Sequence, residues 1–224
     1  MALIILARHA QASFGTSDYD RLSDLGRRQA RWLGEYLGAR GIRPQRVMAG
    51  TLQRQRDTAS IVLDAMGQAG TPIDTHAGLN EYQAEPLVRA HLGVDDFASL
   101  QRADYRKYWQ AFREAMQAWS EDRLTDVPET WGEFGARMQA ALSQARENTG
   151  RDDVVLVVSS GGAICRAVAE LLQAPASIAI ELNLQFRNTA FCELIAGRSG
   201  MRMLSFNNLP HMEHPERREL ITAA

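Results

Sequence analysis

Residues 154–164 read VVLVVSSGGAI, an apolar and largely β-branched run that ends in two serines and two glycines before helical residues begin. A short run that is apolar at every position is typical of a strand buried on both faces, as in a parallel sheet. Residues 3–7, LIILA, have the same character and are followed by Arg8 and His9. Both runs therefore predict buried strands that carry polar groups to one edge of a sheet. Residues 47–49 predict a weaker third strand.

A helical pattern follows each of these runs. Residues 24–39 place apolar side chains on one stripe, with Ser23 in position to cap the first turn. Residues 52–67 and 161–172 are further helices, and Thr51 is the expected cap of the former. Strands that alternate with helices favour βαβ units. The expected fold is α/β: a three-layer α/β/α sandwich with a mostly parallel central sheet.

The middle of the chain is different in character. Residues 86–146 carry no strand signal and predict a helical insertion within a single domain that spans residues 1–224. Large apolar side chains recur there at helical spacing: Tyr105, Trp109, Phe112, Met116 and Trp119, then Trp131, Phe134, Met138 and Leu142. Stripes of this kind indicate core packing more often than a ligand site.

The last quarter of the chain predicts an edge hairpin and a loose tail. Residues 190–195 and 201–206, which flank Gly197 and Gly200, are typical of two antiparallel strands at the edge of the sheet. The polar segment 211–224 is expected to be partly disordered.

Composition excludes several function classes. The 224 residues are 45% hydrophobic and 23% charged, with a formal net charge of −2, so no global attraction to nucleic acid or an anionic membrane is expected. No apolar run reaches the ~18–20 residues of a membrane span, and no basic segment of a signal peptide precedes the first apolar run. Cys165 and Cys192 lie in apolar stretches and are expected to be reduced core thiols. We expect a cytoplasmic protein; its oligomeric state is open, and a homodimer is one possibility.

Three polar motifs fall at the carboxyl ends of the predicted strands, where open parallel sheets bind ligands. Arg8 and His9 follow the first strand, and Arg54 lies in the first turn of the helix after residues 47–49. Ser159, Ser160, Gly161 and Gly162 follow the strand at 154–158 and open the next helix. Arginine presents a rigid fork to phosphate oxygens, and the free N–H groups of a helix start bind anions. Together these motifs favour a phosphate site.

At this point the sequence resembles the histidine phosphatase superfamily, in its phosphoglycerate mutase-like branch. The signature Arg-His-Gly appears here as RHA at residues 8–10, and L-T-x-x-G-x-x-Q-A appears as LSDLGRRQA at 22–30. The second signature, S-x-L-x-R-A-x-x-T-A, appears as GTLQRQRDTA at 50–59 and aligns Arg54 with its arginine. The L-x-E segment appears as LNE and ends at Glu81.

The resemblance implies a phosphatase with a coherent mechanism. His9 would attack phosphorus as a neutral imidazole and form a phosphohistidine. Arg8 and Arg54 would neutralise the charge of the transferring group, and Glu81 would protonate the leaving oxygen and then activate water. The implied enzyme is a phosphoric monoester hydrolase that takes a small phosphorylated substrate. It needs neither a metal nor another cofactor.

The chain departs from the family pattern at residues 158–162, VSSGG. The family has V-S-H-G-G, and its second histidine binds phosphoryl oxygens, whereas Ser160 stands here. Ala10 replaces the signature glycine, and Gly15 stands where many members carry a phosphate-contacting asparagine. Loss of one preorganised donor costs about 10²–10³ in rate, a small part of the acceleration such enzymes reach. We therefore expect Ser160 to remain a phosphate ligand, with the backbone N–H groups of Gly161 and Gly162.

Three alternatives stay open at this stage. One is a phosphoglycerate mutase-like phosphotransferase, and another is a phospho-ligand binding protein with weakened catalysis. A serine hydrolase with Ser160 as its nucleophile is disfavoured, because Val158 stands where the G-x-S-x-G motif needs its first glycine. His211 lies in a segment that resembles the family's C-terminal N-x-x-x-H, where a structural role is expected. We expect the helical insertion to select the substrate.

Overall fold

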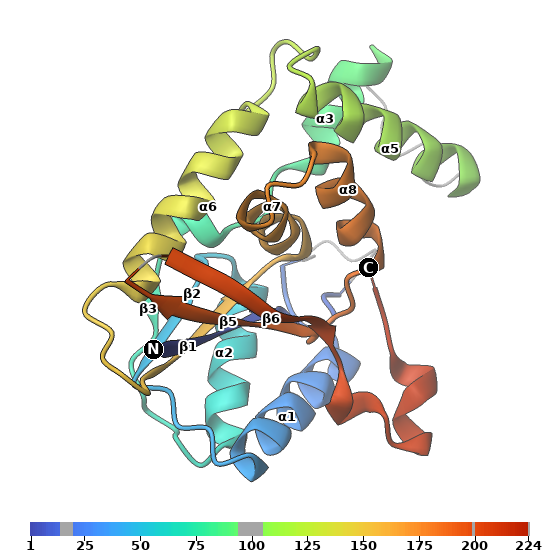
Figure 1. Cartoon of the computed structure of the whole chain (residues 1–224). Helices are drawn as coiled ribbons and strands as arrows, with labels where there is room; N and C mark the ends of the chain where they lie inside the picture. Colours follow the sequence, from blue (N-terminus) through green and yellow to red (C-terminus); the bar gives the residue numbers. More distant parts are fainter. Residues whose placement is uncertain (14–19, 94–104, 199, 224) are drawn as a thin grey trace.

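The computed structural model describes residues 1–13, 20–93, 105–198 and 200–223. Within these ranges six strands form one sheet in the order β3-β2-β4-β1-β5-β6 (Figure 1). The strands are β1 Ala2–Arg8, β2 Arg46–Ala49, β3 Asp74–Thr75, β4 Val154–Ser159, β5 Phe191–Gly197 and β6 Gly200–Asn208. β1, β2, β3 and β4 run parallel, while β5 and β6 are antiparallel and close one edge. The predicted sandwich with a mostly parallel sheet is confirmed.

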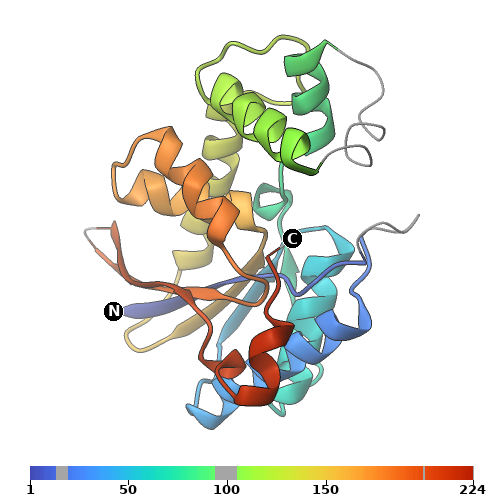
Figure 2. The ribbon, with the colours of Figure 1, turned by 90° about the vertical axis from the view of Figure 1, so that its right-hand side faces the viewer.

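Helices cover both faces of the sheet (Figures 1 and 2). The pair α1 and α2 lies on one face, α6 and α7 lie on the other with α8 beside α7, and α3 packs with α5 farther from the sheet. The helices are α1 Asp24–Ala39, α2 Gln53–Ala65, α3 Ala84–Leu92, α5 Tyr105–Ser120, α6 Trp131–Arg146, α7 Gly161–Leu171 and α8 Ala176–Gln185. Short 3₁₀ turns are η1 Ala77–Leu79, η2 Pro210–Met212 and η3 Pro215–Leu220.

The two faces explain why β1 is apolar at every position before Arg8. Ile4 and Leu6 are fully buried in the core between the sheet and helices α6 and α7. Ile5 and Ala7 are fully buried in the core between the sheet and helices α1 and α2. Successive side chains of a strand point to opposite faces, so a strand covered on both sides needs an unbroken apolar run. β4 alternates between the same two cores. The last residues of these two central strands, Arg8 and Ser159, therefore lie side by side where the parallel strands end.

Most predicted elements are found, with differences at some ends. α1 spans the predicted 24–39, and the side chain of Ser23 accepts from the Gly26 N–H at 3.0 Å. The prediction that Thr51 caps α2 is wrong: α2 begins at Gln53 after Leu52, and its first N–H groups donate to Asp20. The sequence did not indicate β3, which has two residues, or α8, whose apolar residues show little periodicity.

The insertion is helical, as predicted, although it begins at Ala84, and residues 94–104 lie outside the described part. Its stripes enter the core: Phe112, Met116, Trp119, Phe134, Met138 and Leu142 are buried. The expectation of a loose C-terminal tail is wrong, because this segment forms η2 and η3 and the Asn188 N–H donates to the Thr222 carbonyl. Cys165 and Cys192 are both buried and form no disulfide.

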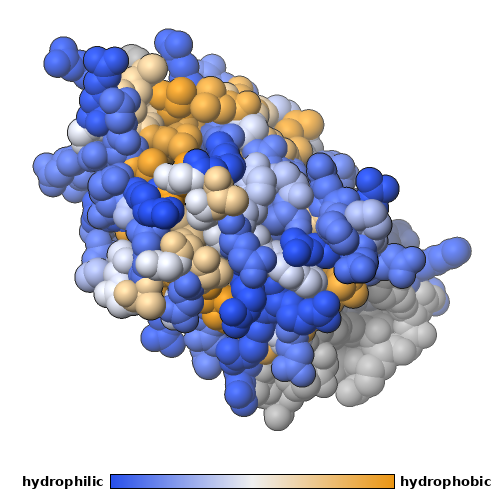
Figure 3. Space-filling model, turned by 90° about the horizontal axis from the view of Figure 1, so that it is seen from below, coloured by the Kyte–Doolittle hydropathy of each residue, from blue (hydrophilic) through white to orange (hydrophobic). Residues whose placement is uncertain are grey.

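The face beyond α1 and α2 is mainly hydrophilic when the molecule is seen from below (Figure 3). Over the described ranges, no helix combines the length and the apolar character that crossing a bilayer would require.

Candidate active site

His9 lies immediately after β1, at the edge where the parallel strands end. Its backbone N–H donates to the Ser159 carbonyl at 2.8 Å, so β4 fixes the position of the loop. The ring Nδ1 lies 2.8 Å from the Ala10 carbonyl, which can only accept, so Nδ1 carries the proton. Nε2 then holds a lone pair and accepts from Nε of Arg54 at 3.2 Å. This is the tautomer that a nucleophilic Nε2 requires.

The surroundings keep this imidazole neutral. Burial lowers the pKa of His9 well below its usual value of 6.5, and the positive charges of Arg54 and Arg8 lower it further. The residue is 5% exposed. A neutral ring keeps the lone pair that attack on phosphorus needs.

Arg54 approaches His9 from the first turn of α2. Its Nη1 pairs with Oδ1 of Asp20 at 2.7 Å, and Oδ2 of Asp20 accepts from the Gln53 N–H at 2.7 Å. Asp20 therefore caps α2 and holds the Arg54 guanidinium at the same time. Sequence reasoning missed Asp20, because the ion pair joins residues 34 positions apart and no local spacing links them.

Arg8 supplies the second positive charge beside His9. Its Nη1 donates to the Phe186 carbonyl at the end of α8. This contact anchors the guanidinium to a residue 178 positions farther along the chain. A Cβ added to Gly161 would lie 3.4 Å from Cζ of Arg8, so the start of α7 packs against this guanidinium. Arg8 and Arg54 are both almost fully buried, at 9% and 8% exposed. Two buried guanidinium groups beside a neutral imidazole favour the binding of an anionic ligand.

Glu81 caps the N-terminus of α7. Its Oε2 accepts from the Gly162 N–H at 2.9 Å and its Oε1 from the Ala163 N–H at 3.2 Å. The Gly162 N–H, expected to bind phosphate, is therefore already occupied. At the same helix end, Gly161 has no acceptor for its N–H among the described residues. Burial raises the pKa of Glu81 above 4.5 despite these hydrogen bonds, which makes it a stronger candidate for a proton donor.

The helical insertion holds the loop that carries Glu81. From α6, Arg137 donates to the carbonyls of Gly78 at 3.0 Å and Asn80 at 2.7 Å, and a two-pronged contact with Glu129 at 2.7 Å orients its guanidinium. The insertion therefore contributes to the site through the backbone on either side of Leu79. Sequence reasoning did not single out Arg137.

Ser160 lies next to this loop but is fully buried. Its Oγ accepts from Nε2 of Gln55 at 2.8 Å, and the same nitrogen donates to the Leu79 carbonyl at 2.9 Å. Oγ of Ser159 donates to that carbonyl as well, at 2.7 Å. Gln55 was not expected to take part in the site. Gly15, the other departure from the family pattern, lies outside the described residues.

A second layer of polar contacts supports the His9 loop from behind. Nδ2 of Asn188 donates to the His9 carbonyl at 3.2 Å, and Oγ1 of Thr222 donates to Oδ1 of Asn188 at 2.8 Å. Nε2 of His211 lies 2.9 Å from Oγ1 of Thr189, whose N–H donates to the same His9 carbonyl. His211 thus contacts this supporting layer, and Nη1 of Arg217 donates to the His211 carbonyl at 2.8 Å. Burial lowers its pKa to about 3.

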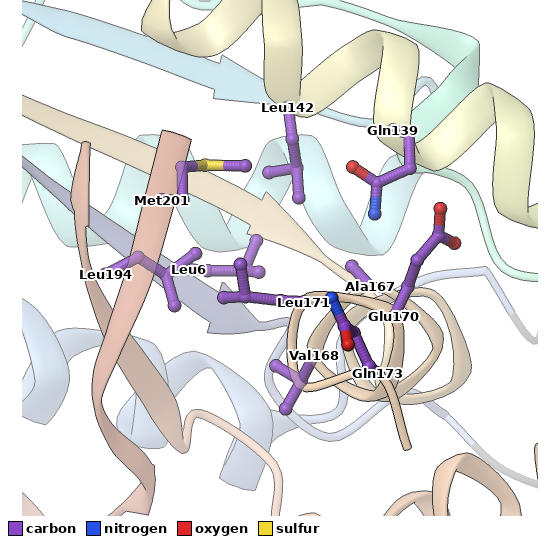
Figure 4. A pocket seen from close by; sticks show the side chains of 10 residues that line it. All are labelled: Leu6, Gln139, Leu142, Ala167, Val168, Glu170, Leu171, Gln173, Leu194 and Met201. Atoms are coloured by element: carbon purple, nitrogen blue, oxygen red, sulfur yellow. The ribbon is translucent and has the colours of Figure 1, made fainter. Parts of the chain in front are cut away.

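A cavity lies apart from these residues. It has a volume of about 230 Å³ and opens beside α6, α7 and the edge hairpin (Figure 4). It is lined by Leu6, Gln139, Leu142, Ala167, Val168, Glu170, Leu171, Gln173, Leu194 and Met201, so the predicted site contributes no side chain to it. In the part of the chain that the structure describes, no three His, Cys, Asp or Glu side chains are grouped as metal ligands would be.

Comparisons with known proteins identify the family of this chain. The model of the histidine phosphatase superfamily (branch 1) matches residues 4–209. A 2,3-bisphosphoglycerate-dependent phosphoglycerate mutase from Methylobacterium sp. (strain 4-46) is 30% identical over 138 residues, which are 58% of this chain and 59% of that protein. The chain thus spans less than two thirds of that relative's length.

Solved structures of similar fold include phosphatases. Phosphoserine phosphatase from Entamoeba histolytica superposes with a TM-score of 0.66 and 18% identity, covering 94% of this chain and 99% of that one. A mycobacterial glucosyl-3-phosphoglycerate phosphatase, solved with inorganic phosphate, gives a TM-score of 0.66 and 22% identity over 93% of this chain and 98% of that one. At these identities the likeness concerns the fold alone.

Proposed function

The chain belongs to the histidine phosphatase superfamily, branch 1, and from that premise we propose that it hydrolyses a phosphomonoester through a phosphohistidine on Nε2 of His9. The observation that supports this most strongly is the state of the His9 ring. Nδ1–H is tied to the Ala10 carbonyl, and the Nε2 lone pair faces the Arg54 guanidinium. A nucleophile is thus held beside a cation suited to a phosphoryl oxygen.

In the first half of the reaction, the Nε2 lone pair attacks phosphorus while the bond to the leaving oxygen breaks. The Nε–H of Arg54 stays on the guanidinium and donates to an equatorial oxygen instead of to His9, and Arg8 and the Gly161 N–H donate to the other oxygens. The proton of the Glu81 carboxyl goes to the leaving oxygen, which departs as an alcohol. Burial keeps that proton on Glu81 more readily, because it raises the pKa of the carboxyl.

In the second half, water attacks the phosphohistidine from the position that the alcohol has left. Glu81, now a carboxylate, takes a proton from the water, and the N–P bond breaks. Inorganic phosphate leaves, and both His9 and Glu81 return to their starting states. Each protein group is used twice and none is consumed.

A phosphoglycerate mutase-like phosphotransferase is the second candidate, because the curated relative at 30% identity carries that name. In a mutase the phosphohistidine would return its phosphoryl group to a second hydroxyl of a bound acceptor rather than to water. A phosphate-binding protein with weakened turnover is the third, because Ser160 stands in place of a histidine. The three differ in what happens to the phosphoryl group.

One set of assays with purified protein separates these possibilities. A panel of phosphorylated metabolites is screened for release of inorganic phosphate, and interconversion of 2- and 3-phosphoglycerate is measured in parallel. We expect phosphate release from at least one small phosphomonoester and none from the His9→Ala variant. Interconversion that exceeds phosphate release would identify a mutase. Phosphate binding without either reaction would identify a binding protein.

A further inference from the structure

Gln55 follows Arg54 on α2 and connects three parts of the site. Its Nε2 donates to the Leu79 carbonyl at 2.9 Å and to Oγ of Ser160 at 2.8 Å, and both Gln55 and Ser160 are fully buried. Leu79 leads into Glu81, so one amide group links the helix of Arg54, the loop of Glu81 and the start of α7. A contact of this kind fixes distances between groups that must act together.

The geometry also fixes which way the Ser160 hydroxyl points. The Leu79 carbonyl can only accept, so the amide nitrogen of Gln55 must face it, and that nitrogen cannot accept from Ser160. Oγ of Ser160 is therefore the acceptor, and its own hydrogen must point elsewhere. Among the described residues, no group accepts that hydrogen.

The carbonyl oxygen of the Gln55 side chain is in an energetically unfavourable position. Its Oε1 is buried with no partner among the residues that the structure describes. This oxygen lies over Gly50, where an added Cβ would overlap it and would come within 2.6 Å of Oδ1 of Asn80. A buried carbonyl left without a donor is destabilising. Position 50 must lack a side chain for Gln55 to fit.

These residues are the places where the chain departs from two quoted signatures. S-x-L-x-R-A has Gly50 for its serine and Gln55 for its alanine, and V-S-H-G-G has Ser160 for its histidine. Gly50 and Gln55 belong to the same signature, whereas Ser160 lies 105 residues after Gln55, and the three positions meet at one point of the structure. A long side chain at 55 fills space where a shorter one stands at 160, and a missing one at 50 makes room.

We propose that Gln55 is a positioning residue which, with Gly50, replaces the missing histidine by turning the Ser160 hydroxyl into a donor to the phosphoryl group. The inference rests on the proposed function. The acceptor follows from the surroundings of Ser160. The residue before it accepts from the His9 N–H at 2.8 Å, and the residue after it packs against Arg8. A phosphoryl oxygen bound beside His9 and Arg8 is therefore the acceptor that completes the network.

Double-mutant cycles test this coupling. The variants are Ser160→His, Gln55→Ala and the two combined, with Gln55→Met as a matched control that keeps length and volume but has no amide. Binding of inorganic phosphate by calorimetry, hydrolysis of 4-nitrophenyl phosphate and the melting temperature are measured for each. The first two readouts report positioning, whereas a purely structural role would move only the third.

We expect Ser160→His alone to weaken phosphate binding and kcat by about tenfold or more, because the imidazole meets Gln55 in a filled space. Adding Gln55→Ala should bring both values back to within about threefold of the wild type. Gln55→Met should lose about tenfold in phosphate affinity with a melting temperature near that of the wild type, since the donor that orients Ser160 is absent. This control holds even if Ser160→His does not fold.

Additive effects in the cycle, or a Gln55→Met variant that binds phosphate like the wild type, would overturn the inference. The proposed function fails separately: a wild type that binds phosphate with the expected coupling but hydrolyses no phosphomonoester would refute it and leave the role of Gln55 standing. Normal hydrolysis with additive effects would refute the role of Gln55 alone.

Discussion

Removal of the Asp20 carboxylate should separate the stability of α2 from the alignment of Arg54. Asp20→Ala deletes the acceptor of the Gln53 N–H at 2.7 Å and the partner of Arg54 at 2.7 Å. Asp20→Asn keeps an oxygen that can cap the helix but has no charge to hold the guanidinium. Comparison of the two variants therefore separates the capping of α2 from the alignment of Arg54.

The magnitudes follow from these contacts. Loss of a helix cap costs about 1 kcal/mol. The ion pair adds only about 0–1 kcal/mol, because the Asp20 side chain is 36% exposed and solvent screens it. A total of about 1–2 kcal/mol lowers the melting temperature of a chain of this size by about 2–8 °C. A preorganised donor is worth about 10²–10³ in rate, so partial misalignment of Arg54 should cost about 10–100-fold in kcat/KM.

Calorimetric melting and steady-state hydrolysis of 4-nitrophenyl phosphate are measured for both variants. Asp24→Asn serves as the control, because it removes an exposed carboxylate from the first turn of α1, away from the site. We expect Asp20→Asn to melt near the wild type yet lose most of the activity that Asp20→Ala loses. If Asp20→Asn retained wild-type kcat/KM, or if the activity lost by Asp20→Ala merely matched its unfolded fraction, Asp20 would be a helix cap alone.

Three further outcomes follow from the pKa shifts of buried groups. Glu81→Gln should slow hydrolysis of an alkyl phosphate about 10²-fold more than that of 4-nitrophenyl phosphate, whose leaving group needs little protonation; equal losses would count against an acid role. The acid limb of kcat/KM should have its midpoint below pH 6.5, since the pKa of His9 is lowered and only protonation of its ring stops attack; a midpoint at or above pH 6.5 would contradict a neutral, buried nucleophile. His211, with its pKa lowered to about 3, stays neutral in the folded state while the unfolded chain takes up a proton, so the free energy of unfolding should fall by about 1.4 kcal/mol per pH unit below pH 6.5. In His211→Asn this slope should decrease by that amount, and an unchanged slope in urea titrations would refute the assignment.

Local patterns were enough to predict much of the fold. The apolar runs of β1 and β4 predicted strands that are covered on both faces. The apolar stripe of α1, with Ser23 before it, predicted the bounds of that helix. Elements that are stabilised mainly by tertiary packing had no recognisable pattern in the sequence. β3 has only two residues, and α8 is apolar without periodicity because its surroundings, rather than an amphipathic face, determine its position.

For the site, the sequence predicted the groups but not their partners. Arg8, His9, Arg54 and Glu81 followed from motif and strand position, and the structure brings them to one edge of the sheet. Asp20 and Gln55 act through contacts with residues far along the chain, so no spacing reveals them. For the same reason the sequence assigned the Gly162 N–H to phosphate, whereas Glu81 takes it.

The most direct test of the account is to identify the covalent intermediate. The protein is mixed with a phosphomonoester that it turns over, quenched in alkali within the first turnovers, and digested for mass spectrometry, with His9→Ala treated in parallel. The account predicts an acid-labile phosphoryl group on the peptide that contains His9, which appears at the rate of turnover and is absent from the variant. Hydrolysis at the wild-type rate with no phosphorylated His9, or with the phosphoryl group on another residue, would contradict it.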